Sequence, residues 1–221
     1  MGDLFYLLLI ILLTIIPQLW VRSTYDKYAS IKINSTKTGE EVAREMLARN
    51  GINGININRI PGELTDHYHP RRKEINLSYS NFDEPTIASI AVAAHETGHA
   101  IQDHKGYFFL RLRQVMGTPA IVASNLSWVF VYLGFILYFT PFIWLGIIML
   151  GIVVLFDLVT LPVEINASKR AKAYLVSTGR YSSQEIEGVS KVLTAAAFTY
   201  IAVTLAGVLQ LIRLLNRVRR D

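Results

Sequence analysis

Four long apolar segments constrain this chain more than any other feature. No charged residue occurs in Leu4–Val21, Gln114–Phe156 or Val192–Ile212. The middle run contains Thr140-Pro141 near its centre, so we expect it to form two helices joined by a tight turn. A helix needs about 20 apolar residues to cross a bilayer. The sequence therefore predicts four transmembrane helices, and buried core helices are a poor alternative for four such segments in 221 residues.

Composition narrows the classes of site that the chain could carry. Because the chain has no cysteine, disulfides and thiolate metal ligands are excluded. The net charge is only +5, and no basic patch is accompanied by base-stacking aromatic residues, so we expect no nucleic-acid partner. The first apolar segment has neither a basic region before it nor a small-residue cleavage site after it, so we expect it to be retained as an anchor.

The segment His95-Glu96-Thr97-Gly98-His99 has the spacing of a catalytic zinc site. Residues four apart lie on one face of an α-helix, so both imidazoles can bind one ion. Glu96 can reach a zinc-bound water, whose pKa falls to about 7, and take its proton. Pro85 suits a first helical turn and Lys105-Gly106 suits a helix end, which predicts a helix at about 85–104. Two buried histidines and a glutamate without a shared role would be costly in an alanine-rich helix.

A catalytic zinc of this kind needs a third protein ligand. The extended motif with a third histidine does not continue here, because Gln102 and Lys105 occupy its positions. Glu185 and Glu187 open a predicted helix, where acids are ordinarily solvated capping charges. Glu164 instead follows the membrane boundary. Its residue type and place fit either a metal ligand or an interfacial ion pair with a neighbouring basic residue.

The polar parts of the chain predict small elements of mixed type. Thr38-Gly39-Glu40-Glu41 is a capping box that opens a short helix ending near Asn50-Gly51. Residues Ile55–Ile60 and Glu74–Ser78 are expected to form strands. The polar segments within 22–118 and 162–191 lie on the same side of the membrane, because the chain crosses the membrane twice between them. The expected fold is mainly α, a four-helix transmembrane bundle with a small α+β membrane-surface metallopeptidase domain. Its parts are an anchor at 1–21, a catalytic segment at 22–118, a transmembrane hairpin at 119–161, a segment at 162–191 that holds the candidate third zinc ligand, and a fourth transmembrane helix with a basic tail at 192–221.

Three segments together resemble the neutral zinc metallopeptidase family of bacterial membrane proteins (YugP-like). They are His95–Gln102, Leu64–Pro70 and Leu161–Ala171, and their order and spacing match across most of the chain. More distantly, the chain resembles the HtpX/Ste24-type membrane gluzincins. The resemblance implies that one Zn²⁺ per chain is bound by His95, His99 and Glu164. It also implies that Glu96 is the general base.

The chain departs from the distant relatives near the proposed metal. They usually carry an aspartate four residues after the glutamate ligand, and this position is Ser168 here. A carboxylate there would orient a ligand histidine. Asp157 returns to the same helix side as Glu164, but it is about 10 Å away along a helix. Pairing of Asp157 inside the bundle is an equal alternative.

The segment before the motif helix is the second cluster of polar residues. In the distant relatives this part of the chain is an edge strand that pairs with substrate. By analogy, His67 or Tyr68 would donate a hydrogen bond to the oxyanion that forms during attack on the scissile carbonyl. A plain turn ahead of a strand is an equal alternative for both residues.

These observations predict a membrane-embedded zinc-dependent endopeptidase that hydrolyses peptide bonds through a Glu-activated, zinc-bound water. The alternative is a catalytically silent zinc-binding membrane scaffold or pseudoprotease. The expected partners are the lipid bilayer and a peptide or protein substrate, membrane proteins included, and the oligomeric state stays open. The expected location is the cell membrane, with several crossings. The positive-inside rule favours a cytoplasmic active site, although four arginines of the C-terminal tail lie on the other side.

Overall fold

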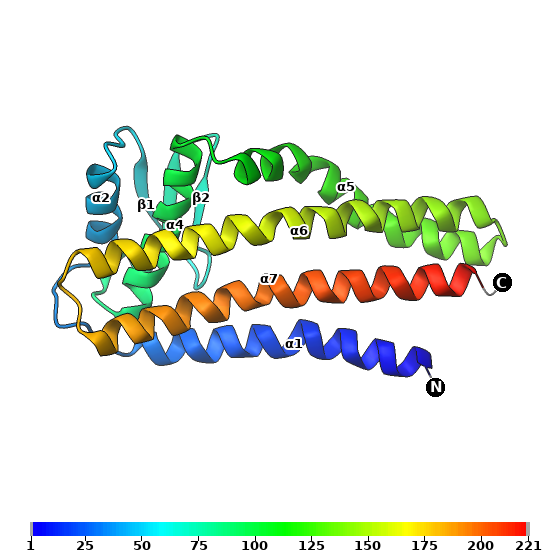
Figure 1. Cartoon of the computed structure of the whole chain (residues 1–221), viewed down its shortest axis with the longest axis horizontal. Coiled ribbons are helices and arrows are strands. Elements are labelled where there is room, and N and C mark those ends of the chain that lie inside the picture. The colour runs from blue at the N-terminus through cyan, green and yellow to red at the C-terminus, as the bar shows by residue number, and fades with distance from the viewer. Residues whose placement is uncertain (1, 220–221) are drawn as a thin grey trace. The chain divides into compact units, whose positions relative to one another are not determined.

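A computed structural model of the chain describes residues 2–219 (Figure 1). The elements follow one another as α1 (Gly2–Ala29), α2 (Gly39–Arg49), β1 (Asn56–Ile60), β2 (His67–His69), β3 (Glu74–Ser78), α3 (Tyr79–Asp83), α4 (Ile87–His104), α5 (Phe108–Ile136), α6 (Thr140–Ser177) and α7 (Ser183–Val218). Contacts divide the chain into two compact units. The bundle unit comprises the described parts of Met1–Gln18, Phe108–Pro162 and Thr199–Asp221, and the surface unit comprises Leu19–Tyr107 and Val163–Phe198.

The long helices confirm a mainly α fold with four apolar segments. Helices α1, α5, α6 and α7 are each long and apolar enough to cross a membrane. Helix α1 exposes large apolar side chains along its length, among them Leu8, Ile11 and Ile15. Such a surface suits lipid better than water, because every exposed apolar side chain would otherwise be solvated.

Helix α6 is longer than a bilayer requires. Its 38 residues correspond to about 57 Å, whereas the hydrocarbon core is about 30 Å thick. The helix passes through Pro162 and continues to Ser177, beyond the expected end of the hairpin near residue 161. Its last part, Val163–Ser177, belongs to the surface unit. The apolar span and the polar segment that follows it are therefore one continuous helix.

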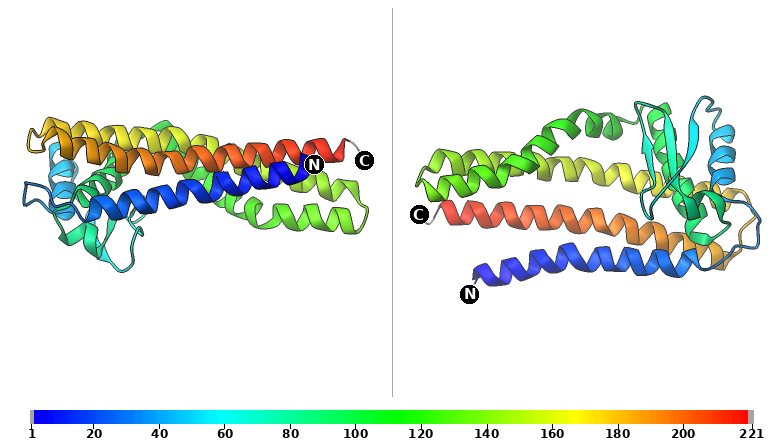
Figure 2. Two further views of the ribbon diagram at one scale, coloured as in Figure 1. Left: turned by 90° about the horizontal axis from the view of Figure 1, so that it is seen from below. Right: turned by 180° about the vertical axis from the view of Figure 1, so that it is seen from behind.

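Within the bundle unit, α5 and α6 lie side by side and pack through small residues (Figure 2). A Cβ at Gly146 would lie 2.6 Å from the carbonyl oxygen of Ser127 and 2.5 Å from a methyl group of Val131. Only glycine permits this approach of two backbones, as is common between transmembrane helices. Val131, Ile143 and Leu214 belong to the apolar core of this unit.

The surface unit is built on a three-stranded sheet of order β1-β3-β2. Strand β3 pairs in parallel with β1 and antiparallel with β2, so β3 is central and β2 is an edge strand. Helices α2 and α4 lie beside this sheet (Figure 1). The capping box predicted at Thr38 is present, with Glu41 Oε2 accepting a hydrogen bond from Thr38 N–H. The core combines buried Met46 of α2, Ile75 and Leu77 of β3, and alanines of α4.

His67–His69 forms β2, with His67 opposite Asn76 of β3, so this segment is an edge strand, as the analogy with the distant relatives suggested, and not a plain turn. One detail of the surface unit differs from expectation. Pro85 does not start the motif helix. Instead, Thr86 is the N-cap of α4, and its side chain accepts a hydrogen bond from Ser89 N–H. The Pro85 carbonyl accepts a hydrogen bond from Ile33 N–H, which ties the helix start to the segment that follows α1.

Candidate metal centre

Helix α4 places two histidines on one face. The helix begins at a reciprocal capping box between Thr86 and Ser89, and alanines fill its buried side. His95 and His99 follow one turn apart, with ring centroids 4.7 Å apart in an edge-to-face arrangement. The His95 side chain is 14% exposed and that of His99 is 9% exposed. Both imidazoles are therefore held by surrounding structure rather than left in solvent.

Gly98 allows α6 to approach α4 closely at this point. A Cβ at Gly98 would lie 2.8 Å from the carbonyl oxygen of Ala167 and 3.1 Å from its Cα. Such contacts are too short for any side chain, so a glycine is required where the two backbones cross. Ala167 is itself fully buried. The glycine of the motif thus sets the separation between the histidine helix and the helix that carries Glu164.

Glu164 completes a cluster of three potential ligands. Its Oε2 lies 3.2 Å from Nε2 of His95 and 3.5 Å from Nε2 of His99. One donor atom from each of the three residues lies within 4.8 Å of the others. Glu164 is only 2% exposed, although it is a charged residue. Burial of a carboxylate is costly unless cations or hydrogen bonds compensate for it.

The cluster fits a zinc ion by both chemistry and spacing. Zinc binds imidazole nitrogen and carboxylate oxygen at about 2.0–2.2 Å in a tetrahedral arrangement, which separates neighbouring ligand atoms by about 3.3 Å. The two nitrogen-to-oxygen distances of 3.2 and 3.5 Å are close to that value. Three protein ligands also leave the fourth position that a catalytic site requires. The structure therefore brings together His95, His99 and Glu164, the three ligands expected from the resemblance.

The remaining ring nitrogens of both histidines have partners. Ser168 Oγ lies 3.2 Å from Nδ1 of His95. Ser168 is thus placed where the distant relatives carry an aspartate, and its hydroxyl can accept a hydrogen bond from that nitrogen. An imidazole that donates through Nδ1 keeps a lone pair on Nε2, and the contact with Ser168 is compatible with this ligand tautomer of His95.

Gln102 plays the corresponding role for His99, and the sequence analysis did not foresee it. Its Oε1 lies 3.0 Å from Nδ1 of His99, and its Nε2 donates to the carbonyl of Val163 at 2.7 Å. A carbonyl only accepts, so the amide nitrogen must face Val163 and the amide oxygen must face His99. The oxygen in turn requires a proton on Nδ1 of His99. Nε2 then carries the lone pair that a metal needs.

Gln102 also connects the two helices of the site. It is fully buried, and its Nε2 makes a second hydrogen bond with Asn166 Oδ1 at 3.1 Å. Arg170 Nε donates to the same Asn166 oxygen at 2.7 Å. This contact gives Arg170 a hydrogen-bond partner other than Glu164. The one sequence clue to Gln102 was its spacing, three residues after His99 and on the same helix face.

The electrostatic surroundings of His99 depend on the two glutamates of the site. Burial lowers the pKa of His99, but the carboxylates of Glu164 and Glu96 raise it, and the net effect is a pKa above the usual value. Protons and a metal cation would compete for the same nitrogen. Glu96 is itself half-buried on α4, next to His95 in the chain. Its carboxylate is thus held near enough to His99 to act on it electrostatically.

The structure places the two oxyanion candidates on the edge strand β2. His67 is exposed, and its ring nitrogens lie 2.8 Å from the carbonyl oxygen of Thr65 and 3.2 Å from Asn76 Nδ2. The Tyr68 hydroxyl donates to Asp103 at 2.7 Å, and Asp103 lies one turn after His99 on α4. Burial and this carboxylate raise the pKa of Tyr68. The Tyr68 hydroxyl is thus directed at α4, and a catalytic role for either residue stays a prediction.

Other acids named by the sequence have different surroundings. Asp157 belongs to the bundle unit, where a Cβ at Gly207 of α7 would lie 3.9 Å from its Oδ2. The two Nδ1 positions that a second carboxylate would orient are occupied by Ser168 and Gln102. Glu185 accepts hydrogen bonds from the backbone of Asn34 and Ser182, which is a capping role. A role for Asp157 near the metal stays a prediction.

Comparisons with known proteins agree with this site. Residues 4–219 match the family described as "Putative neutral zinc metallopeptidase". The chain is 40% identical over 196 residues to the "Putative membrane protease YugP" of Bacillus subtilis (strain 168), across 89% of this chain and 87% of that protein. No solved structure matches the chain. The apolar helices and this relative support a membrane protein, and the family description supports a zinc protease. The expected resemblance is confirmed, and the chain belongs to the neutral zinc metallopeptidase family.

Proposed function

We propose that this protein is a multi-pass, zinc-dependent endopeptidase in which Glu96 acts as the general base. The observation that carries the proposal is the convergence of His95, His99 and Glu164 on one point, from two helices that cross at Gly98. A His-His-Glu set with one open position is the ligand pattern of hydrolytic zinc sites. One such cluster is found among the described residues, which supports one zinc per chain.

The chain's own residues supply binding and proton transfer. Zinc, when bound, would act as a Lewis acid toward the scissile carbonyl and would lower the pKa of a water to about 7. Glu96 would take the proton of the attacking water and deliver it to the leaving amine. Ser168 and Gln102 would hold the imidazoles of His95 and His99 in the orientation and tautomer that the ligand role needs.

We further propose that the substrate binds along β2 as an extended peptide. Within residues 2–219, this strand pairs with β3 on one side only, so its other backbone edge can exchange hydrogen bonds with an added strand. Tyr68 ties β2 to α4 through Asp103, which fixes the strand relative to the histidine helix. The substrate would be a peptide or protein, membrane proteins included, and the bilayer would be a second partner.

The general-base role can be tested with Glu96→Gln. Gln keeps the size of the side chain but takes no proton, so we expect zinc content to stay at one per chain while proteolysis of a peptide library falls by at least about a hundredfold. Glu187→Gln is the matched control, because Glu187 is exposed and pairs with Lys191. A zinc-binding scaffold or pseudoprotease predicts no proteolysis in the wild type. Wild-type rates in Glu96→Gln would overturn the assignment of the base.

The ligand role of Glu164 needs a separate test. Removal of one of three ligands should lower zinc affinity strongly, so Glu164→Gln is expected to lose zinc in competition with a chelator. Wild-type zinc affinity in this variant would exclude Glu164 as a ligand. We also propose a cytoplasmic active site in the cell membrane, from the distribution of basic residues around the spans. A reporter fused after Asp221 should then be found outside the cytoplasm.

A further inference from the structure

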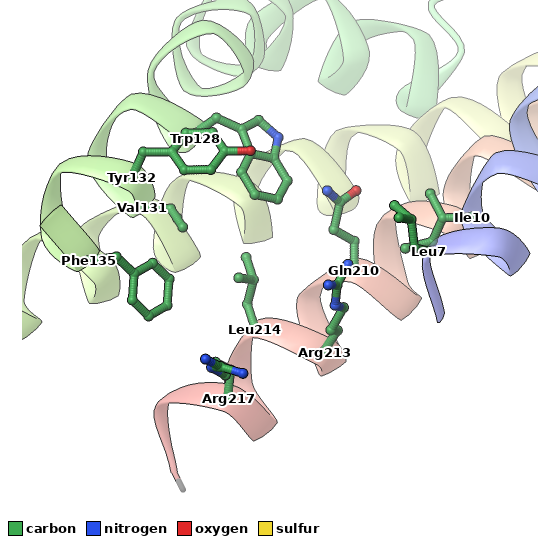
Figure 3. A pocket seen from close by; sticks show the side chains of 10 residues that line it. All are labelled: Leu7, Ile10, Trp128, Val131, Tyr132, Phe135, Gln210, Arg213, Leu214 and Arg217. Atoms are coloured by element: carbon green, nitrogen blue, oxygen red, sulfur yellow. The ribbon is translucent and has the colours of Figure 1, made fainter. Parts of the chain in front are cut away.

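A groove of about 700 Å³ lies within the bundle unit, and none of its lining residues belongs to the proposed catalytic site (Figure 3). Its walls come from the first turns of α1, the last turns of α5 and the last turns of α7. The volume falls in the range of about 300–1,000 Å³ that is typical of sites for small organic ligands. The groove is therefore large enough to hold part of an amphiphilic molecule.

The wall formed by α5 is apolar and aromatic. Trp128, Val131 and Phe135 recur at three- and four-residue spacing, and Tyr132 stands beside Trp128 with ring centroids 5.6 Å apart. Figure 3 shows these side chains directed toward Leu214 on α7. Most of the side-chain atoms on this wall are carbon and neither donate nor accept hydrogen bonds. It suits a hydrocarbon chain, because apolar contact is its main possible interaction.

The wall formed by α7 carries two positive charges. Arg213 and Arg217 line the groove one helical turn apart, with Gln210 a turn before Arg213 (Figure 3). Guanidinium groups are well suited to phosphate, because their planar N–H donors can bind two oxygens at once. No acidic side chain lines the groove among the described residues. The charge of this wall therefore favours an anionic ligand group.

The position of the arginines fits the depth of lipid headgroups. Arg213 follows directly on the uncharged run that ends at Ile212, so the two guanidinium groups stand where α7 leaves the hydrocarbon region. Leu7 and Ile10 come from the start of the first apolar run, and Phe135 is one residue before the end of α5. Three helices thus combine an apolar slot with a cationic end at the same boundary.

We propose that this groove is a binding site for an anionic phospholipid. Its phosphate would be bound by Arg213 and Arg217, with Gln210 as a further donor. One acyl chain would lie against Trp128, Phe135 and Leu214. Basic pockets between transmembrane helices can bind anionic headgroups in this way. The site is independent of the proposed proteolysis, because the two sets of residues lie in different units.

Native mass spectrometry of the delipidated full chain in a neutral detergent tests the proposal. Dioleoyl phosphatidylglycerol and dioleoyl phosphatidylcholine share their acyl chains and differ in net charge. We expect about tenfold tighter binding of phosphatidylglycerol, and we expect Arg213→Gln/Arg217→Gln to abolish this preference. Arg71→Gln/Arg72→Gln removes the same charge from a loop of the surface unit and should leave the preference unchanged. The melting temperature serves as the measure of folding for every variant.

The contributions of the apolar slot and of the two arginines to lipid binding can be measured separately. Leu7→Trp would fill the slot at an exposed position of α1, and we expect it to weaken the binding of both lipids without lowering the melting temperature. Inorganic phosphate should compete weakly, since it lacks the acyl chain. Equal binding of the two lipids, or an unchanged preference in the double arginine variant, would overturn the proposal. Full competition by phosphate alone would assign the arginines to a free anion instead of a lipid.

Discussion

The amide oxygen of Gln102 lies 3.0 Å from Nδ1 of His99, while its amide nitrogen donates to the Val163 carbonyl of α6. One buried side chain thus orients a proposed zinc ligand and joins the two helices that supply the ligands. This relationship replaces the carboxylate that orients a histidine in many zinc sites. It also makes the tautomer of His99 depend on the packing of α4 against α6.

Substitution of Gln102 should therefore weaken metal binding. We expect Gln102→Ala to lower zinc affinity by about 10- to 100-fold, the usual effect of losing such a partner. Gln102→Glu keeps an oxygen for His99 and loses the donor to Val163, so it should retain more affinity than the alanine variant. Gln184→Ala, an exposed glutamine at the start of α7, is the control. Competition with a chelator measures the zinc affinity of all three variants. Equal affinities in the three would exclude a role of Gln102 in orienting His99.

Ser168 offers a test of what the missing aspartate would do. Its hydroxyl lies 3.2 Å from Nδ1 of His95, and a carboxylate in its place would be a stronger acceptor. We expect Ser168→Asp to bind zinc at least about tenfold more tightly than Ser168→Ala, with the wild type between them. The measurement is the zinc dissociation constant at fixed pH. The reverse order would show that the hydroxyl does not orient His95.

Patterns local in the sequence predicted much of this structure. The apolar runs, the capping box at Thr38 and the strands near Ile57 and Ile75 depend on neighbouring residues, and each is present. The pairing of Glu164 with the histidine helix depends on a crossing of α4 and α6. Only the resemblance to the zinc metallopeptidase family predicted that Glu164 would lie beside the two histidines. The glycine that permits it, Gly98, stood inside the motif but carried no indication of its partner Ala167.

What local patterns did not predict depends on non-local pairing. Strand β2 has only three residues, too few for an alternation pattern, so only the analogy with the distant relatives suggested it, and it exists because it pairs with β3. Asp66 strengthens that pairing, since its carboxylate accepts hydrogen bonds from Ser78 N–H and Asn81 Nδ2. Gln102 was not foreseen as a functional residue because glutamine is not a usual zinc ligand. Its role appears only when Val163 and His99 are both beside it.

The helix crossing itself can be perturbed at Gly98. Alanine there would place its Cβ 2.8 Å from the Ala167 carbonyl oxygen, so one of the two backbones must move. We expect Gly98→Ala to cost about 1–3 kcal/mol of stability and to weaken zinc binding, because Glu164 would move away from the histidines. Gly151→Ala in α6 has open space around the new Cβ and serves as the control. An equal melting temperature for both variants would contradict this account.

The pair formed by Glu45 and Arg180 predicts a dependence of stability on pH. Two hydrogen bonds of 2.6 and 2.7 Å join the guanidinium to the carboxylate, and the bond from Arg180 lowers the pKa of Glu45. The stabilisation is therefore complete above the unfolded pKa of about 4.5 and is lost as the pH falls through the lower folded value. The pair is partly exposed, so after solvent screening it contributes about 0.5–1 kcal/mol.

Glu45→Gln should accordingly lower the melting temperature at pH 7 and have a smaller effect at pH 3.5. The comparison between wild type and variant at each pH cancels the other carboxylates that titrate in the same range. Glu63→Gln, which removes an exposed carboxylate paired with Arg22, is the control for a general charge effect. A difference between wild type and Glu45→Gln that does not shrink in acid would show that the pair contributes nothing measurable.

Tyr68 separates a structural role of β2 from a catalytic one. Its hydroxyl donates to Asp103, and its pKa is raised, so it stays a hydrogen-bond donor throughout the neutral pH range. If this donor turns toward the oxyanion during the reaction, Tyr68→Phe should lower kcat by about 100-fold or more and leave KM and zinc content nearly unchanged. If the hydroxyl only ties β2 to α4, the same variant should lower the melting temperature and raise KM instead. Asp103→Asn distinguishes the two further, because it weakens the tie between β2 and α4 but keeps the tyrosine hydroxyl. A lowered kcat in Tyr68→Phe, together with an unchanged kcat in Asp103→Asn, would establish Tyr68 as a group that acts on the substrate.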